Sequence, residues 1–319
     1  MRKPIRIGTR ESKLAIWQAT LVQQELSRWQ YPSELVFIKS EGDIDLITPL
    51  YEMGVQGIFT KSLDMALLKG RIDISVHSMK DVPTRLAEGI AQAAVLKRAS
   101  PKDLLVYREE AAPGFNWNYF HTLNESPSSV AGIFTVATSS IRRRAQWLHH
   151  FPDHQLEVLR GNVNTRLNKL ANSHWHGAIF AAAGLERIDL RPANSIELDW
   201  MLPAPAQGAI VVVCRREDAE CLAACAPLND TETALCVKTE RDFLRTLMGG
   251  CTAPISALAT IQNGQLLFCG SLLSPDGKQC LEVKKATDVL NASDLGCIAG
   301  QEILDRGGKE IIDRIHATG

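Results

Sequence analysis

The chain has 319 residues, which is long enough for two or three domains of ordinary size, and we expect three. Hydrophobic residues make up 45% of it and charged residues 22%, values of a packed globular protein that exclude extensive disorder and a fibrous repeat. The formal net charge of −1 excludes a globally basic nucleic-acid binder, so any anion site has to come from local clustering of arginine and lysine.

The amino terminus and the cysteines are those expected of a cytoplasmic protein. Residues 1–6 lack the apolar core of a signal peptide, and no apolar run approaches the roughly 20 residues that cross a bilayer. The eight cysteines form no CxxC pair and have no histidine at metal-ligand spacing. We therefore expect mostly buried thiols, no disulfide framework and no metal site.

The first part of the chain alternates strand and helix patterns. Residues 5–8 form a short β-like run, apolar residues recur at helical spacing over 14–22, and residues 35–38 and 72–76 are further strand candidates. This alternation predicts a mainly parallel α/β sheet, whose ligands bind beyond the carboxyl ends of the strands. The glycine-containing stretch 41–57 has little periodicity and is interpreted as a long surface loop that can act as a lid.

The same design recurs after a polar, proline-bearing boundary at residues 98–103. Strand-like residues 134–137 lead into a Thr-Ser-Ser turn, and the apolar run 156–159 leads to Arg160. We therefore expect two related α/β lobes. A buried strand at 210–214 follows the proline-containing crossing 203–205 and is expected to return to the first lobe.

From about residue 234 the pattern changes to a helix and then to strands separated by two hairpin-type turns. These turns are Asn263-Gly264 and the Pro-Asp-Gly sequence at 275–277. A third, smaller α+β domain is the expected result. The predicted division is domain 1 at residues 1–100 plus about 207–228, domain 2 at 101–206, and domain 3 at 229–319.

Arginines and hydroxyls gather after the strands of the second lobe. Thr138 and Ser140 follow one strand directly, and Arg142 and Arg143 occupy the first turn of the next helix. Because arginine binds carboxylates bidentately, this pattern predicts an anion site. The alternative is an ordinary solvated face.

Four other residues add to this signal. Arg160 and Arg166 lie at and after the end of the next strand, and Arg10 and Ser12 form a weaker version of the pattern in the first lobe. Ser12 can equally serve as a helix cap, and the two roles are compatible.

Two further positions are candidates for chemistry. Lys80 and Asp81 lie just beyond a strand, where catalytic groups often gather, although a Lys-Asp pair is more often a surface ion pair. Cys251 follows two glycines, which let a bulky group approach its sulfur, and a thiolate suits covalent attachment. The alternative for Cys251 is a small buried hydrophobic residue.

Five motifs, in this order and spacing, closely resemble those of the porphobilinogen deaminase family. They span nearly the whole chain and are Gly8-Thr9-Arg10-Glu11-Ser12-Lys13-Leu14-Ala15, Val76-His77-Ser78-Met79-Lys80-Asp81-Val82-Pro83, Thr138-Ser139-Ser140-Ile141-Arg142-Arg143, Leu159-Arg160-Gly161-Asn162-Val163 and Gly249-Gly250-Cys251. The resemblance implies a transferase that joins four porphobilinogen units head to tail, releasing ammonia at each addition, and then frees hydroxymethylbilane by hydrolysis. It also implies two lobes like those of periplasmic binding proteins, a third domain that carries the cofactor cysteine, and a dipyrromethane cofactor held to Cys251 by a thioether.

The resemblance further assigns roles to individual residues. Asp81 matches the family's catalytic aspartate. The residues implied to bind cofactor, besides Cys251, are Lys80, Ser78, Thr138, Ser140, Arg142, Arg143, Arg160, Gln207 and Gly208. Those implied to bind substrate are Arg10, Ser12, Arg166 and Arg187. A monomer is expected, with no nucleic-acid or membrane partner.

The chain departs from the family pattern in two places, and two other function classes compete. Gln56 stands where the family's lid usually has a lysine, and Thr252-Ala253 replaces the common polar-then-valine pair. A non-catalytic two-lobed anion-binding protein or ligand-sensing domain would have the same lobes, but it would not need a third domain presenting Cys251. A nucleic-acid binder is disfavoured because the arginines form no long basic stripe with stacking aromatics.

Overall fold

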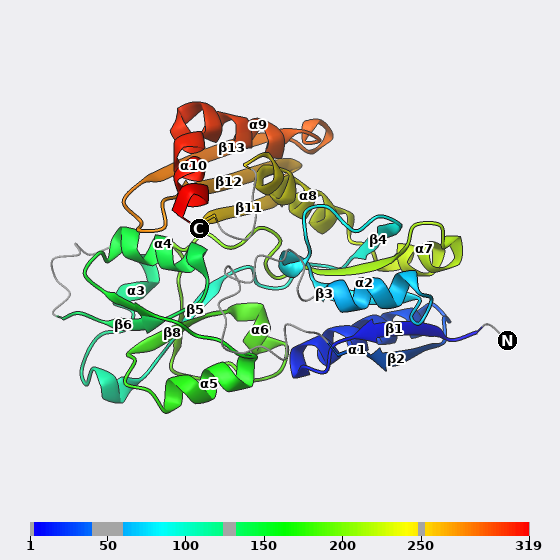
Figure 1. The fold of residues 1–319 in the computed structure, drawn as a ribbon, viewed down its shortest axis with the longest axis horizontal. Helices are drawn as coiled ribbons and strands as arrows, with labels where there is room; N and C mark the ends of the chain where they lie inside the picture. Colours follow the sequence, from blue (N-terminus) through cyan, green and yellow to red (C-terminus); the bar gives the residue numbers. More distant parts are fainter. Residues whose placement is uncertain (1–2, 40–59, 124–131, 248–252, 319) are drawn as a thin grey trace.

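In the computed structural model, two α/β lobes lie side by side and a smaller α+β unit packs above them (Figure 1). The structure describes residues 3–39, 60–123, 132–247 and 253–318. The predicted lid at 41–57 and the glycines and cysteine of 249–251 therefore lie outside the described residues.

The first lobe contains a five-stranded sheet in the order β2-β1-β3-β10-β4. β1 pairs in parallel with β2 and β3, whereas β10 is antiparallel to both of its neighbours, β3 and β4. Its elements are β1 (Ile5–Thr9), α1 (Lys13–Arg28), β2 (Ser33–Phe37), α2 (Lys61–Leu68), β3 (Ile74–Ser78), β4 (Ile90–Val95), β10 (Ile210–Arg215) and α7 (Ala219–Cys225).

Helix α1 packs on the sheet of the first lobe through one apolar face. Ala15, Ala19, Val22 and Leu26 recur every three or four residues, so they share one buried face of the helix. That face packs in one apolar cluster with β1 and β3, and burying a leucine there stabilises the fold by about 2 kcal/mol. α1 is thereby held against the sheet, with its amino terminus at the strand ends.

The second lobe has a five-stranded sheet of matching design, in the order β7-β6-β8-β5-β9. β6 is parallel to β7 and β8, and β5 is antiparallel to β8 and β9. Its elements are β5 (Asp103–Tyr107), α3 (Tyr119–Thr122), β6 (Thr135–Ala137), α4 (Ile141–His150), β7 (Gln155–Glu157), α5 (Val163–Ala171), β8 (Gly177–Ala181), α6 (Ala182–Glu186) and β9 (Ser195–Glu197).

The prediction of two mainly parallel α/β lobes is confirmed, with one difference that both sheets share. In each sheet four strands run in one direction, and the strand that follows a crossing between the lobes, β5 or β10, runs against them. The expected return of residues 210–214 to the first lobe is also confirmed, because β10 lies between β3 and β4.

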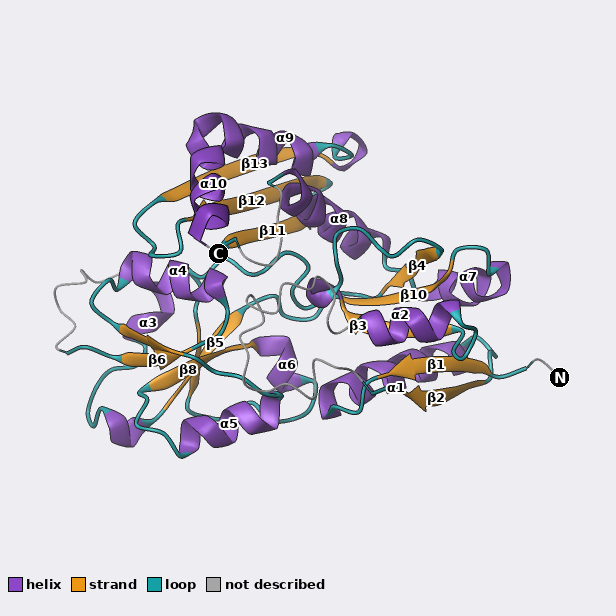
Figure 2. Ribbon diagram, viewed as in Figure 1, coloured by secondary structure: helices purple, strands orange, loops and turns teal. Residues whose placement is uncertain are grey.

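The third unit is a three-stranded antiparallel sheet with helices packed on it (Figure 2). Its two hairpins confirm the predicted turns: Asn263 and Gly264 both have positive φ, at 51° and 76°, and Gly277 has φ 76°. The elements are α8 (Thr231–Thr246), β11 (Ile255–Gln262), β12 (Gln265–Leu273), β13 (Cys280–Asp288), α9 (Leu295–Ile303) and α10 (Lys309–Thr318).

Polar contacts join the third unit to both lobes. The fully buried Glu240 of α8 pairs with Arg98 of the segment that leaves the first lobe, at 2.5 Å. Towards the second lobe, Gln146 of α4 donates to Ser256 Oγ at 3.0 Å, and His149 Nδ1 donates to the carbonyl of Gly277 at 2.7 Å. The β12–β13 hairpin is thus docked on the helix that carries the paired arginines.

The two chain crossings between the lobes lie against each other. The Ala99 N–H donates to the Gly208 carbonyl at 3.1 Å. Gly208 has φ 86°, and a Cβ there would lie 2.6 Å from the Ala99 oxygen, so this close approach requires glycine. The lobes therefore meet at a pair of hydrogen-bonded segments.

Candidate functional site

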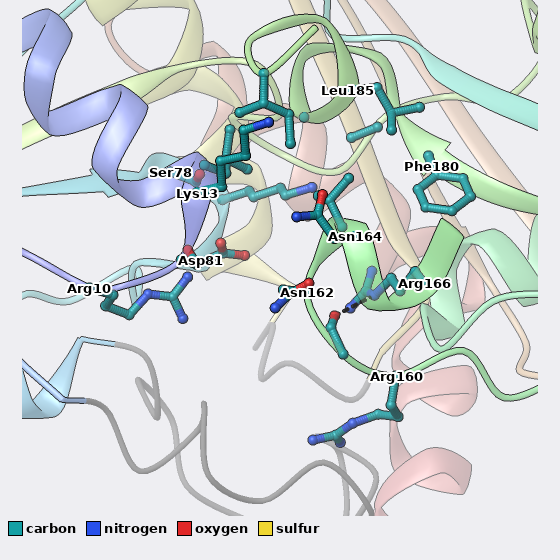
Figure 3. A pocket seen from close by; sticks show the side chains of 18 of the residues that line it. Arg10, Lys13, Ser78, Asp81, Arg160, Asn162, Asn164, Arg166, Phe180 and Leu185 are labelled. Atoms are coloured by element: carbon teal, nitrogen blue, oxygen red, sulfur yellow. Dashed lines mark hydrogen bonds between the residues drawn. The ribbon is translucent and has the colours of Figure 1, made fainter. Parts of the chain in front are cut away.

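A cavity of about 260 Å³ opens between the two lobes (Figure 3). It lies at the carboxyl ends of β1, β3 and β8, which is where ligands of such sheets bind. Of the predicted site residues, those in its wall are Arg10, Ser12, Ser78, Lys80, Asp81, Arg143, Arg160 and Arg166. The described predicted residues outside the wall are Thr138, Ser140, Arg142, Arg187, Gln207 and Gly208.

Two helices present their amino termini to the cavity from opposite lobes. Ser12 caps α1 by accepting from the Ala15 N–H at 3.3 Å, and Asn162 caps α5 by accepting from the Thr165 N–H at 3.0 Å. Both caps are also wall residues. Because helix amino termini carry partial positive charge, the cavity favours anions on both sides.

Asp81 and Lys80 occupy a short 3-10 helix, Met79–Asp81, directly after β3. Figure 3 shows the Asp81 carboxylate directed into the cavity, near Arg10. Arg241 of α8 holds this turn from the third unit, donating to the carbonyls of Val82 at 2.9 Å, Pro83 at 2.5 Å and Met79 at 3.3 Å. The candidate catalytic carboxylate therefore stands on a turn that another domain supports.

The position of Ser78 is fixed by a residue beneath it. Gln18 of α1 is 2% exposed and donates to Ser78 Oγ at 2.8 Å. This contact directs the hydroxyl of the last residue of β3 to a set place in the cavity wall.

Lys80 is exposed at the cavity wall, but the protein around it reduces the hydration of its ammonium group. This loss of hydration lowers its pKa to about 8; Asp81 and Asp103 oppose the shift, while Arg143 and Arg142 add to it. Its ammonium group donates to Gln207 Oε1 at 3.4 Å. Near neutral pH Lys80 is mostly protonated and can bind a carboxylate.

Arg142 and Arg143, adjacent in the first turn of α4, share one buried carboxylate. Asp103 accepts from Arg142 Nη2 and from Arg143 Nη2, both at 2.7 Å. Burial disfavours the charged form of Asp103, but the two arginines prevail and lower its pKa to about 2. Arg143 forms part of the cavity wall. Arg142 does not; it donates a second hydrogen bond, to the Leu202 carbonyl.

Arg160 and Arg166 complete the wall of the second lobe. Arg166 Nε donates to the Gly161 carbonyl at 2.7 Å, and burial, with Arg143 and Arg160 nearby, lowers its pKa to about 10 despite the opposing effect of Asp81. It remains a cation at neutral pH. Arg160 is 6% exposed and still forms part of the wall, so its charge faces a confined space.

The other predicted residues support the surroundings of the cavity. Ser140 caps α4 by accepting from the Arg143 N–H, and Thr138 Oγ1 accepts from the Ser140 N–H at 3.2 Å. Arg187 donates to the Gly208 carbonyl at 2.6 Å and lies 5.6 Å from the ring centre of Trp17 in α1. These contacts shape the second lobe and link it to the first.

Several residues of the site were not predicted from the sequence. Lys13 and Asn164 line the cavity at the first turns of α1 and α5, a position that the turn-before-helix pattern could have revealed (Figure 3). Asp103 and Gln18 gave no such signal, because their partners are far away in sequence.

The electrostatic character of the cavity follows from its wall. Six cationic side chains contribute to it, and Asp81 is the one carboxylate among the described lining residues. The cations are Arg10, Lys13, Lys80, Arg143, Arg160 and Arg166. Such a site suits a ligand with several carboxylates. Asp81, which lies among the cationic side chains, is placed for proton transfer or for stabilising a cation.

No helix within the described ranges is long and apolar enough to cross a membrane. Several solved structures align with part of the chain at low identity. They include YhfZ from Shigella flexneri, with 13% identity, 75% of this chain and 96% of that chain covered, and a TM-score of 0.36. Another is the GluR0 ligand binding core with L-glutamate, with 14% identity, coverage of 71% and 92%, and the same TM-score of 0.36.

The sequence relatives of this chain have much higher identity to it than these solved structures do. The family model for the porphobilinogen deaminase dipyromethane cofactor binding domain matches residues 5–223, and that for the porphobilinogen deaminase C-terminal domain matches residues 234–305. A porphobilinogen deaminase of Desulforamulus reducens is 37% identical, with 99% of each chain covered. One of Pelobacter propionicus is 38% identical, with 98% of each covered. The chain therefore belongs to the porphobilinogen deaminase family, whose cofactor is dipyrromethane.

Proposed function

We propose that this chain condenses four porphobilinogen molecules head to tail on a dipyrromethane attached to Cys251, releasing ammonia at each addition, and finally frees hydroxymethylbilane by hydrolysis. The observation that carries the proposal is the interlobe cavity, in which cations of both lobes surround Asp81. Each pyrrole ring of the substrate bears an acetate and a propionate, so a growing chain presents many carboxylates, which these cationic donors can bind.

The residues present fit a dipyrromethane group. Its four carboxylates match the cations of the cavity, and we assign Lys80, Ser78, Arg143 and Arg160 to hold it. When bound, the group supplies the α-carbon to which the first porphobilinogen is joined. Arg10, Ser12 and Arg166 are assigned to the carboxylates of the incoming substrate.

Cys251 is proposed as the attachment point because of its motif, and three of the other thiols are poor candidates. Cys214, Cys225 and Cys236 are buried, which raises the pKa of each, to about 11, 12 and 11 respectively. A thiol with so high a pKa is rarely a thiolate at neutral pH and is therefore a weak nucleophile.

Asp81 is assigned the catalytic role. In each addition the bond between the aminomethyl carbon and nitrogen of porphobilinogen breaks, ammonia leaves, and the substrate becomes a cation. The Asp81 carboxylate can stabilise this cation through the pyrrole N–H and can receive the proton released when the new carbon–carbon bond forms. The surrounding arginines bind carboxylates, so their positive charge is largely balanced before the substrate cation develops.

The predicted residues outside the wall receive supporting roles in this proposal. Thr138 and Ser140 form the start of α4, and Arg142 and Gln207 act through the buried Asp103. Gly208 permits the close approach of the two crossings, and Arg187 spans the lobes. We also propose the three-domain division given above, a monomeric state and a cytoplasmic location; sedimentation analysis of the purified chain tests the second.

An intact-mass measurement tests the proposal. The wild-type protein and Cys251→Ser are compared, and each is supplied with porphobilinogen. We expect an adduct of dipyrromethane mass in the wild type alone, together with ammonia release. A folded wild type with no adduct and no consumption of porphobilinogen refutes the proposal and favours the non-catalytic anion-binding protein.

A further inference from the structure

Asp103 lies where the chain enters the second lobe, outside the five sequence motifs described above. It is the first residue of β5, directly after the chain crosses from the first lobe, and its side chain is fully buried. It accepts hydrogen bonds from Arg142 Nη2, from Nε and Nη2 of Arg143, and from Gln207 Nε2 at 2.8 Å. Both carboxylate oxygens are therefore used.

Gln207 carries this network to the opposite wall of the cavity. It belongs to the second crossing, and its Nε2 also donates to the Pro101 carbonyl of the first crossing at 2.7 Å. Its Oε1 accepts from Lys80, which follows β3 of the first lobe. A continuous path of hydrogen bonds thus runs from Lys80 through both crossings to Arg143.

The donors of Arg143 are directed by this arrangement. Nε and Nη2 go to Asp103, and Nη1 goes to the Ile179 carbonyl at 2.9 Å. The guanidinium is consequently fixed in orientation at the cavity wall. Without the carboxylate, two adjacent arginines of α4 would repel each other in a buried site, and Arg143 would lose the partner that sets its plane.

We infer that Asp103 is a positioning residue that holds Arg143 in the cavity wall and, through Gln207, couples it to Lys80 on the other lobe. Its carboxylate also balances charge at the site. The charged groups that act on Lys80 are Asp81 of its own turn, Arg143 and Arg142 of α4, and Asp103 of β5. Loss of the Asp103 charge removes one of the two anions that keep Lys80 protonated, so the pKa of Lys80 falls.

The test measures the ionisation of Lys80 directly and does not depend on turnover. Full-length wild type and Asp103→Asn are pulsed with acetic anhydride at a series of pH values, and acetylation of Lys80 is followed by peptide mass spectrometry. We expect the pKa of Lys80 to be lower in Asp103→Asn by about one unit. Turnover of porphobilinogen, which rests on the proposed function, is expected to fall at least about tenfold.

The control is Asp73→Asn, which removes a carboxylate paired with Arg6 and Arg215 in the first lobe, away from the cavity. We expect it to lower stability while leaving the pKa of Lys80 as in the wild type. An unchanged pKa of Lys80 in folded Asp103→Asn overturns the inference. If the pKa of Lys80 shifts in Asp103→Asn but the wild type itself does not consume porphobilinogen, the inference stands and the proposed function is refuted instead.

A second variant covers the case in which Asp103→Asn does not fold. Gln207→Met keeps every charge and removes the hydrogen bonds that join Lys80 to Asp103, together with those to the Pro101 and Lys102 carbonyls. We expect a smaller decrease in the pKa of Lys80 and reduced turnover. If Lys80 titrates in Gln207→Met as it does in the wild type, the coupling through Gln207 is refuted.

Discussion

The docking of the third unit on the second lobe can be tested at a single glycine. Gly277, in the β12–β13 turn, has φ 76°, and a Cβ there would lie 2.6 Å from both the Ala145 oxygen and the His149 nitrogen of α4. Those atoms are backbone and cannot rotate away. Gly277→Ala therefore has to push the hairpin off the helix.

The expected loss of stability has three separable contributions. Placing alanine at positive φ costs about 1 kcal/mol. Overpacking against the helix adds about 1–3 kcal/mol, and loss of the His149 hydrogen bond adds about 1 kcal/mol. We expect Gly277→Ala to lower the free energy of unfolding by roughly 3–5 kcal/mol.

Gly264 is a matched control within the same sheet. It also has φ 76°, but nothing lies within 4 Å of a Cβ built on it. Gly264→Ala should therefore lose only the backbone contribution, about 1 kcal/mol. Urea denaturation followed by circular dichroism measures both variants, and hydrogen exchange in α4 should increase in Gly277→Ala alone. Equal losses in the two variants would refute the packing argument.

Three further predictions concern the site and its pH response. Asp81→Asn should keep the cofactor adduct but release ammonia from porphobilinogen at least about a hundredfold more slowly, and unimpaired release removes Asp81 from catalysis. Arg241→Met should lower kcat about tenfold while KM changes less, because the turn of Asp81 loses its support; steady-state kinetics check this, and Arg241→Lys should recover part of the rate. Burial, with Arg10 nearby, lowers the pKa of His77 from 6.5 to about 3, so the unfolded chain binds a proton that the folded protein does not. The free energy of unfolding should fall by about 1.4 kcal/mol per pH unit from this group as the pH drops from 6.5 towards 3. Urea denaturation at several pH values should show a shallower loss in His77→Asn, and parallel curves would contradict the assignment.

Much of the fold could be predicted because its signals are local. Strand and helix periodicities revealed the two lobes, and the Asn263-Gly264 turn specified its hairpin through residues that accept positive φ. Ser12 illustrates the same point, since its position before a helix predicted the cap that the structure shows. The antiparallel direction of β5 and β10 was not predicted, because no local pattern encodes which neighbours a buried strand will pair with.

The site was predictable in its members but less so in their orientation. Arg142 and Arg143 are adjacent and were assigned the same role, yet only Arg143 reaches the cavity wall. What separates them is the long-range contact with Asp103, 39 and 40 residues away, together with the Leu202 carbonyl. Side-chain direction of this kind depends on tertiary contacts that periodicity and motif spacing do not carry.

The placement of β10 has a consequence for how the chain assembles during synthesis. β3 and β4 do not pair with each other; β10 lies between them and is made more than a hundred residues later. All five strands of the second sheet, by contrast, lie between residues 103 and 197. As the chain emerges from the ribosome, the second lobe can complete its sheet first. The sheet of the first lobe cannot be completed until β10, which ends at Arg215, has been synthesised. The amino-terminal lobe is then expected to fold after the second lobe. The cavity between the lobes forms only when the amino-terminal lobe has folded.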